Sequence, residues 1–245
     1  MEDLLPILFL LISFIYSSVG MGGGSSYTAI MAIFGMNYNL IPINSLFLNL
    51  CVTFVGTINF WRSGHGRLNL VAPFLITSIP MAFIAGFLKL PEIIFQSILI
   101  LIFLIFIIRI FIFDRLTITY QLSKAQKWML IICFGSILGF ISGSVGIGGG
   151  ICLIPLIIIF GLGSAKEASA AGAMFILVNS IAGIVPRIMI GAYEIIPIIP
   201  MVVAVLIGGI TGSYMGSVRF DKRFIERTTG GILILAIFFL IYRLL

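Results

Sequence analysis

The feature that most constrains this chain is a set of long stretches without a charged side chain. Residues 4–61, 68–88, 128–165 and 195–218 contain no Asp, Glu, Lys or Arg. A helix that spans a lipid bilayer needs about 20 apolar residues, so each stretch can supply at least one such helix. Only 9% of the residues are charged and the mean hydropathy is +1.27, whereas a soluble domain carries about 25% charged residues. The sequence therefore predicts an all-α polytopic membrane protein.

A glycine-rich motif occurs twice in this apolar background. Residues 18–24 read SVGMGGG and residues 144–150 read SVGIGGG, 126 residues later. Each glycine costs a helix about 1 kcal/mol relative to alanine, so three in succession predict a break in the helix at the same place in each half. Glycine breaks of this kind either allow close packing of small residues or expose backbone amides to a ligand.

The repeated motif divides the chain into two halves. We predict an N-terminal transmembrane repeat at 1–113, a cytoplasmic connecting loop at 114–127, and a C-terminal transmembrane repeat at 128–245. Each repeat would consist of a glycine-tipped re-entrant or broken helix followed by three transmembrane helices. Two equivalent halves are typical of secondary transporters.

The positions of the basic residues favour re-entrant hairpins. If each break is a bend inside one spanning helix, the best orientation places eight of the fourteen Lys and Arg residues inside, which is almost no bias. If each break is the tip of a hairpin, six crossings remain, and an N-terminus on the outside places eleven of the fourteen inside. Those inside are Arg62, Arg67, Arg109, Arg115, Lys124, Lys127, Lys166, Arg219, Lys222, Arg223 and Arg227, and those outside are Lys89, Arg187 and Arg243. The sequence thus predicts two inverted repeats with both termini outside.

The breaks are also the predicted ligand site. The first amides of a helix have no partner within the helix and carry about half a positive charge, which attracts anions. Two hairpins that enter from opposite sides would bring two such helix ends together near mid-membrane. The predicted substrate-binding residues are Gly22, Gly23, Gly24, Ser25, Ser26, Asn49, Gly148, Gly149, Gly150, Ile151 and Asn179. Asn49 and Asn179 are included because they follow the two breaks at similar distances, although buried Asn side chains also serve as hydrogen bonds between helices.

Two arginines near the ends of predicted helices are candidates for gating or anion steering. Arg62 and Arg187 close the second helix of each half, if the broken helix is counted as the first. Arginine at such a position also anchors a helix at the membrane interface. Arg187 is the stronger candidate, since it lies on the side that otherwise has little positive charge.

Other classes of site have little support. One histidine, His65, cannot form a multi-histidine metal site, and the three cysteines Cys51, Cys133 and Cys152 lie in apolar runs, where they are expected to pack. We therefore expect no metal and no cofactor. The net charge of +6 lies in the loops, where it sets membrane orientation and does not indicate a nucleic-acid partner. The expected partners are the lipid bilayer and a small anion, and a homo-oligomer is compatible with the sequence.

The paired glycine motifs also resemble those of a known family. Gly20, Gly22, Gly23 and Gly24, then Gly146, Gly148, Gly149 and Gly150, with Pro155 shortly afterwards, are similar to the pattern of the sulfite exporter TauE/SafE family. The resemblance covers essentially the whole chain. It implies transport of small sulfur-containing or organic anions, such as sulfite or sulfonates, across the cytoplasmic membrane.

The predicted function is therefore a secondary membrane transporter, an exporter of such anions, that binds them between the two glycine breaks. A passive anion channel is the alternative, followed by an intramembrane enzyme, for which the sequence offers no nucleophile with a base or metal. The exact anion, the direction of transport, a proton or sodium as coupling ion, and the oligomeric state stay open.

Overall fold

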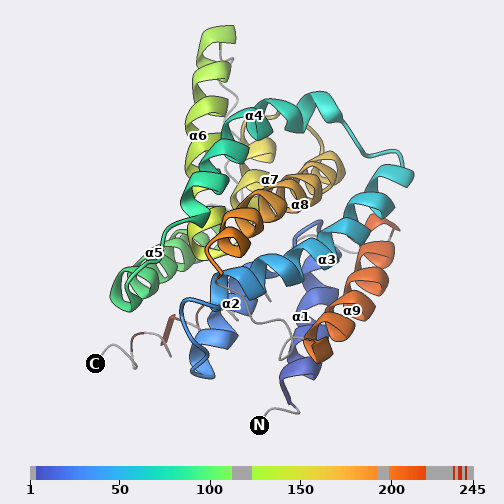
Figure 1. Ribbon diagram of the computed structural model, residues 1–245. Coiled ribbons are helices and arrows are strands. Elements are labelled where there is room, and N and C mark those ends of the chain that lie inside the picture. Colours follow the sequence, from blue (N-terminus) through green and yellow to red (C-terminus); the bar gives the residue numbers. More distant parts are fainter. Residues whose placement is uncertain are drawn as a thin grey trace.

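The computed structural model describes residues 4–111, 123–191 and 199–218, together with Ile234, Ile237, Phe238 and Ile241. The helices in this part are α1 (Leu4–Ser17), α2 (Gly24–Ile33), α3 (Ile41–Arg62), α4 (Leu68–Gly86), α5 (Glu92–Phe111), α6 (Lys124–Val145), α7 (Gly150–Ile159), α8 (Ala165–Met189) and α9 (Ile199–Val218). They form a single bundle (Figure 1). The all-helical prediction is confirmed. Most of the predicted loop at 114–127 and most of residues 219–245 lie outside the described residues. The division into repeats stays a prediction.

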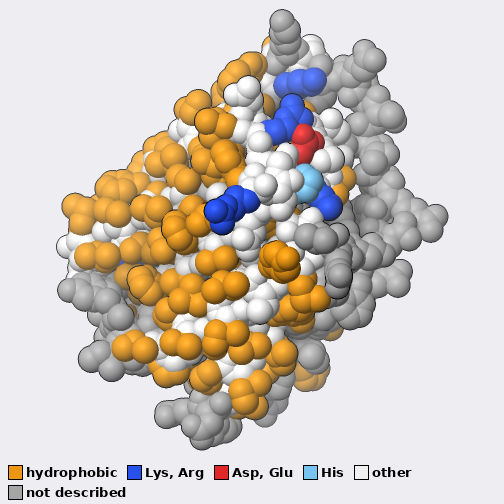
Figure 2. All heavy atoms as spheres, turned by 90° about the vertical axis from the view of Figure 1, so that its right-hand side faces the viewer, with side chains coloured by type: hydrophobic (Ala, Val, Ile, Leu, Met, Phe, Trp, Pro, Cys, Tyr) orange, Lys and Arg blue, Asp and Glu red, His pale blue; other side chains and the backbone are white. Residues whose placement is uncertain are grey.

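Five of the described helices are long and apolar enough to cross a membrane, namely α3, α4, α6, α8 and α9. Figure 2 shows the matching surface, a broad apolar face with the charged groups gathered toward one end. Large apolar side chains such as Ile76 and Tyr214 are each 69% exposed, as expected for side chains that face lipid. The protein is therefore a multi-pass membrane protein.

Each half packs its fourth helix on the first helix of the other half. Helix α4 packs along α6, α9 packs along α1, and the third helices α3 and α8 cross each other at the centre (Figure 1). Helices α2 and α7 occupy matching places beside α3 and α8. Two halves that are related by a two-fold axis would show this pattern, in which each half contacts the other through the same pair of helices.

Glycines at every fourth position bring α6 close to α4 and α9 close to α1. A Cβ added to Gly139 or Gly143 of α6 would overlap the backbone carbonyl of Ser78 or Ala82 of α4. Glycines 208, 212 and 216 of α9 lie equally close to the α1 backbone around residues 10, 14 and 18. Because the residue numbers rise together in both pairs, each pair of helices runs parallel. Small residues that let two backbones approach are a common basis of helix association in membranes.

The crossing of α3 and α8 contains the same contact twice. Gly56 of α3 faces Ala173 of α8, and Gly183 of α8 faces Leu46 of α3. Gly183 lies 127 residues after Gly56, and Ala173 lies 127 residues after Leu46, so the two contacts correspond to each other. Since residue numbers rise in one helix and fall in the other, α3 and α8 run antiparallel. A two-fold axis that relates antiparallel helices must be perpendicular to them.

The loops gather at two ends of the bundle. Asn39, Lys89 and Ile190 line one pocket and define what we call the Lys89 end. At the other end, the Arg67 end, the Arg67 guanidinium lies 3.0 Å from the Glu167 carboxylate. The start of α6 and the end of α7 lie together near that second end, where residues 127, 160 and 162 line a shared apolar pocket. Helices α6 and α7 therefore form a hairpin that returns to the end from which it started.

Candidate functional site

Left-handed glycines form the turn of each hairpin. In the first break, Gly20 and Gly23 have φ angles of 74° and 93°, and in the second, Gly146, Gly148 and Gly149 have φ angles of 85°, 83° and 68°. Residues with a Cβ rarely adopt this conformation. Gly23 and Gly149 are the N-cap residues of the return helices α2 and α7. The predicted breaks are thus present, and each return helix begins at the last glycine of its motif, Gly24 or Gly150.

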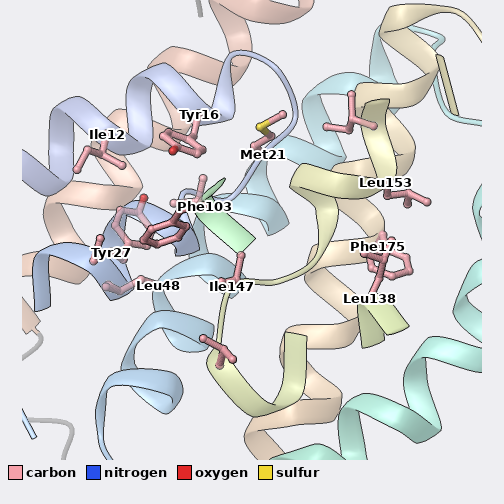
Figure 3. Packing of buried hydrophobic residues seen from close by; sticks show 14 of the residues in the cluster. Ile12, Tyr16, Met21, Tyr27, Leu48, Phe103, Leu138, Ile147, Leu153 and Phe175 are labelled. Carbon is pink, nitrogen blue, oxygen red and sulfur yellow. The ribbon is translucent and has the colours of Figure 1, made fainter. Parts of the chain in front are cut away.

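The two breaks lie against each other in the centre of the bundle. A Cβ on Gly24 would stand 2.7 Å from the carbonyl oxygen of Ile147 and 2.9 Å from that of Gly146. The Ser45 hydroxyl, on α3, lies 2.8 Å from the Gly146 carbonyl oxygen and 3.2 Å from that of Gly24, so it links the two breaks. Figure 3 shows Ile147 of the second break among the buried side chains, together with Leu48 of α3.

Each tip also reaches the first turns of a helix from the other half. A Cβ on Gly146 would lie 2.6 Å from the carbonyl oxygen of Pro42, the second residue of α3. A Cβ on Gly20 would overlap the carbonyl of Ser169, the fifth residue of α8. Glycine is therefore required at both places, and each break lies beside the N-terminal part of a central helix from the other half.

The first turn of α2 offers backbone donors. Among the described residues, no acceptor is found for the backbone N–H groups of Gly24, Ser25 and Ser26, whereas the next one, of Tyr27, donates to the Gly23 carbonyl at 2.9 Å. Such unpartnered amides form an anion-binding helix terminus. The Tyr16 hydroxyl lies 2.7 Å from the Ser26 hydroxyl and 3.3 Å from that of Ser25, and all three residues are buried.

The first turn of α7 is more self-contained. The N–H of Gly150 donates to the Gly148 carbonyl at 2.9 Å, and that of Cys152 donates to the Gly149 carbonyl at 3.2 Å. The described part of this turn has no hydroxyl corresponding to Ser25 or Ser26, since Ile151 and Cys152 follow Gly150. The polar groups of the site are therefore concentrated at the first break.

Asn49 lies where the two breaks meet. Its side chain is fully buried, its Nδ2 donates to the Gly146 carbonyl at 3.3 Å, and its Oδ1 has no hydrogen-bond partner. A Cβ on Gly22 or Gly24 would overlap the Asn49 amide, and a Cβ on Gly148 would lie 3.0 Å from its Nδ2. One side chain thus contacts both glycine motifs.

Asn179 has a different environment. Its Nδ2 donates to the carbonyl of Phe175 on its own helix at 2.9 Å, and its Oδ1 is buried without a partner. The α8 residue that contacts Gly148 and Gly150, as Asn49 contacts Gly22 and Gly24, is Ile176. The structural counterpart of Asn49 is therefore an isoleucine, and the sequence-based pairing of Asn49 with Asn179 is displaced by three residues.

The two arginines are also not equivalent. Arg62 is exposed at the Arg67 end of α3. Arg187 is only 3% exposed, and its guanidinium donates to the carbonyls of Gly143 at 2.6 Å and Ser144 at 2.9 Å. These carbonyls belong to the last turn of α6, where orphan acceptors and the negative end of the helix dipole favour a cation. Arg187 thus attaches the end of α8 to the helix that leads into the second break.

Sequence reasoning missed Ser45, Tyr16 and Ile176. Ser45 precedes Asn49 by four residues, a spacing that places both side chains on one face of a helix, so its nearness to Asn49 was predictable but its contact with the breaks was not. Tyr16 and Ile176 carried no such signal, because each is one of many apolar or aromatic residues in its stretch.

A helical bundle with helices of membrane-spanning length and two glycine breaks that meet at its centre is typical of polytopic membrane transporters. The chain belongs to the sulfite exporter TauE/SafE family, whose model matches residues 5–240. It is 31% identical over 217 residues to the probable membrane transporter protein y4hK of Sinorhizobium fredii (strain NBRC 101917 / NGR234), with 87% of each chain covered. No solved structure matches the chain significantly. The protein is therefore a membrane transporter.

Proposed function

We propose that this transporter exports small sulfur-containing or organic anions, such as sulfite or sulfonates, and binds them between the two glycine breaks. The observation that carries the proposal is the unpartnered first turn of α2, which faces the second break with Asn49 between them. The donors available to an anion are the N–H groups of Gly24, Ser25 and Ser26, the two serine hydroxyls, and the Asn49 amide. Because these donors are dipoles and not full charges, the anion is held without the cost of an empty buried cation.

The proposed site is closed in this conformation. The Asn49 amide and the Ser45 hydroxyl are bonded to the Gly146 carbonyl, and Tyr16 is bonded to Ser26. An anion has to replace these hydrogen bonds, each of which contributes about 1 kcal/mol. Affinity is therefore modest, on the order of micromolar to millimolar, or about −8 to −4 kcal/mol. Such an affinity suits a substrate that must also be released.

The packing of the two halves supports alternating access. Each half is held to the other by reciprocal contacts, of α4 on α6 and of α9 on α1, around the antiparallel α3 and α8. A rocking motion that loosens one reciprocal contact and tightens the other would open the site first to one side and then to the other. The grouping of loops at two ends, with α6 and α7 returning to the Arg67 end, supports inverted re-entrant hairpins over bent spanning helices.

The grouping of the loops at two ends of the bundle, together with the distribution of basic residues among these loops, supports one orientation in the cytoplasmic membrane. The Arg67 end faces the cytoplasm, the Lys89 end faces outside, and both termini lie outside. In this orientation Arg187 lies near the outer mouth. Its proposed role is to attract the anion there, while Arg62 does the same at the inner mouth.

The test is flux in proteoliposomes that contain the purified protein. Accumulation of sulfite or methanesulfonate against its own gradient, driven by an imposed proton or sodium gradient, supports a coupled transporter. Flux that only follows the anion gradient and persists under every ion gradient indicates a passive channel. The absence of flux for all small anions, in a protein that stays folded, would contradict the proposal.

A further inference from the structure

A polar pocket opens at the Lys89 end, beside the start of the second glycine motif. It lies between the start of α3, the loop between α4 and α5, and the end of α8. The pocket is small and partly open to the outside in this conformation. Its lining includes Asn39, Lys89, Ser144 and Arg187. No residue of the proposed central site is among the residues that line it.

The pocket has an excess of positive charge. Lys89 and Arg187 are the charged side chains among the described residues that line it, and none of these residues is acidic. Arg187 is 3% exposed, and its Nε is buried without a hydrogen-bond partner. A buried guanidinium is costly unless its donors and charge are satisfied, and the two carbonyls that it contacts supply only partial charges. A ligand that completes this arrangement has to be an anion with acceptor oxygens.

We propose that this pocket is a second anion site, which binds the oxyanion group of a small soluble anion between Lys89 and Arg187. It would serve as the outer station for the exported anion. The identity of this anion and the role of the pocket as an outer station rest on the proposed function, whereas the positive charge of the pocket does not depend on transport.

The position of Arg187 links this site to the second glycine break. Arg187 lines the pocket, and its guanidinium donates to the carbonyls of Gly143 and Ser144, which directly precede the break at residues 146–150. An anion that accepts a hydrogen bond from the unpartnered Nε shares the positive charge of the guanidinium with these carbonyls. Binding of an anion in the pocket therefore weakens the attachment between α8 and the end of α6. Because such coupling is reciprocal, movement of α6 alters the affinity of the pocket for the anion.

The experiment measures protection of a cysteine at the pocket. Asn39 is exposed and lines the pocket, so Asn39→Cys, in a full-length chain whose native cysteines are replaced, reports on its occupancy. The rate of maleimide labelling is followed in neutral-lipid nanodiscs against methanesulfonate and sulfate, with chloride added to equal ionic strength. Methanesulfonate is expected to slow labelling at millimolar concentrations. Labelling of Ser63→Cys, at the opposite end, is expected to be unaffected.

Two lysine variants give a matched comparison. Lys89→Gln should raise the half-protecting concentration about threefold to fivefold, the effect of one exposed charge. Lys127→Gln makes the same charge change at the opposite end and should leave it unchanged. Arg187→Gln should abolish protection. If this variant does not fold, the comparison of Lys89→Gln with Lys127→Gln still tests the site. Asn49→Ala, which removes a donor from the central site, should leave protection intact.

Three outcomes would overturn the second site. One is the absence of protection at about 100 mM methanesulfonate, far above a millimolar dissociation constant. Another is an equal change of the half-protecting concentration in Lys89→Gln and in Lys127→Gln. The last is protection by phosphatidylglycerol in the nanodisc but not by soluble anions, which assigns the pocket to a lipid headgroup. Protection without any flux in proteoliposomes would instead refute the proposed transport and retain the site.

Discussion

The contact between the two glycine breaks can be tested by adding one methyl group. In Gly24→Ala, the new Cβ would overlap the Asn49 amide and stand 2.7 Å from the Ile147 carbonyl oxygen and 2.9 Å from that of Gly146. Ordinary contacts begin near 3.4 Å, so the second break has to retreat by about 0.5 to 0.7 Å and the Asn49 side chain has to move. Gly24 is helical and does not have a positive φ. Backbone strain therefore does not contribute.

The expected loss of stability follows from these contacts. Overpacking costs about 1 to 3 kcal/mol, and loss of the hydrogen bond from Asn49 to Gly146 costs about 1 kcal/mol more. Replacement of glycine by alanine in a helix returns at most about 1 kcal/mol. We therefore expect a net decrease of about 1 to 3 kcal/mol in the free energy of unfolding. Transport should be lost as well, because the methyl group fills the space between the breaks.

A matched control is available in α3. Gly56 is also a buried helical glycine, but a Cβ there would meet only the Cβ of Ala173, at 3.9 Å. Gly56→Ala should be neutral or slightly stabilising and should transport normally. The assays are the midpoint of thermal unfolding and anion flux in proteoliposomes. Equal stability and equal flux in Gly24→Ala and Gly56→Ala would refute the close contact of the two breaks.

Three further predictions concern the site and its orientation. Asn49→Ala should weaken anion binding by about 1 to 3 kcal/mol through loss of a hydrogen bond to a charged ligand, and Asn179→Ala by less, as measured by equilibrium binding; the reverse order would place the anion on α8. Gly149→Val should abolish flux in a membrane-inserted protein, because a β-branched residue cannot adopt a φ of 68° without strain; normal flux would show that this turn is not needed. Asn37→Cys should react with an impermeant maleimide from outside the cell and Ser63→Cys only from inside, and labelling of both from one side would exclude the orientation.

The positions of the helices could be derived from the sequence to within a few residues. Charge-free stretches of sufficient length can only be spanning or buried helices, and α4, expected at 68–88, is found at Leu68–Gly86. The glycine motifs fixed the starts of α2 and α7 to within one residue. Both signals are local, because helix propensity and hydrophobicity depend on the chain itself and not on what it packs against.

The residues that face the breaks depended on the tertiary structure. The motifs are separated by 126 residues, but the matching contacts of α3 and α8 are separated by 127, as in Gly56 and Gly183. Asn49 and Asn179 are separated by 130 residues, three more than the matching contacts. Three residues correspond to about 4.5 Å along a helix. A small change in loop length therefore decides which side chain reaches the site, and here it selects Ile176.

The sequence by itself determined that this protein is a helical membrane transporter with two glycine breaks, since composition, length and motif are properties of the chain alone. Only the tertiary structure decided that Ser45 and Asn49 join the breaks and that Arg187 is buried against the end of α6. These contacts connect residues that are 44 to 101 positions apart. No local pattern records them, because they arise only when the two halves pack together.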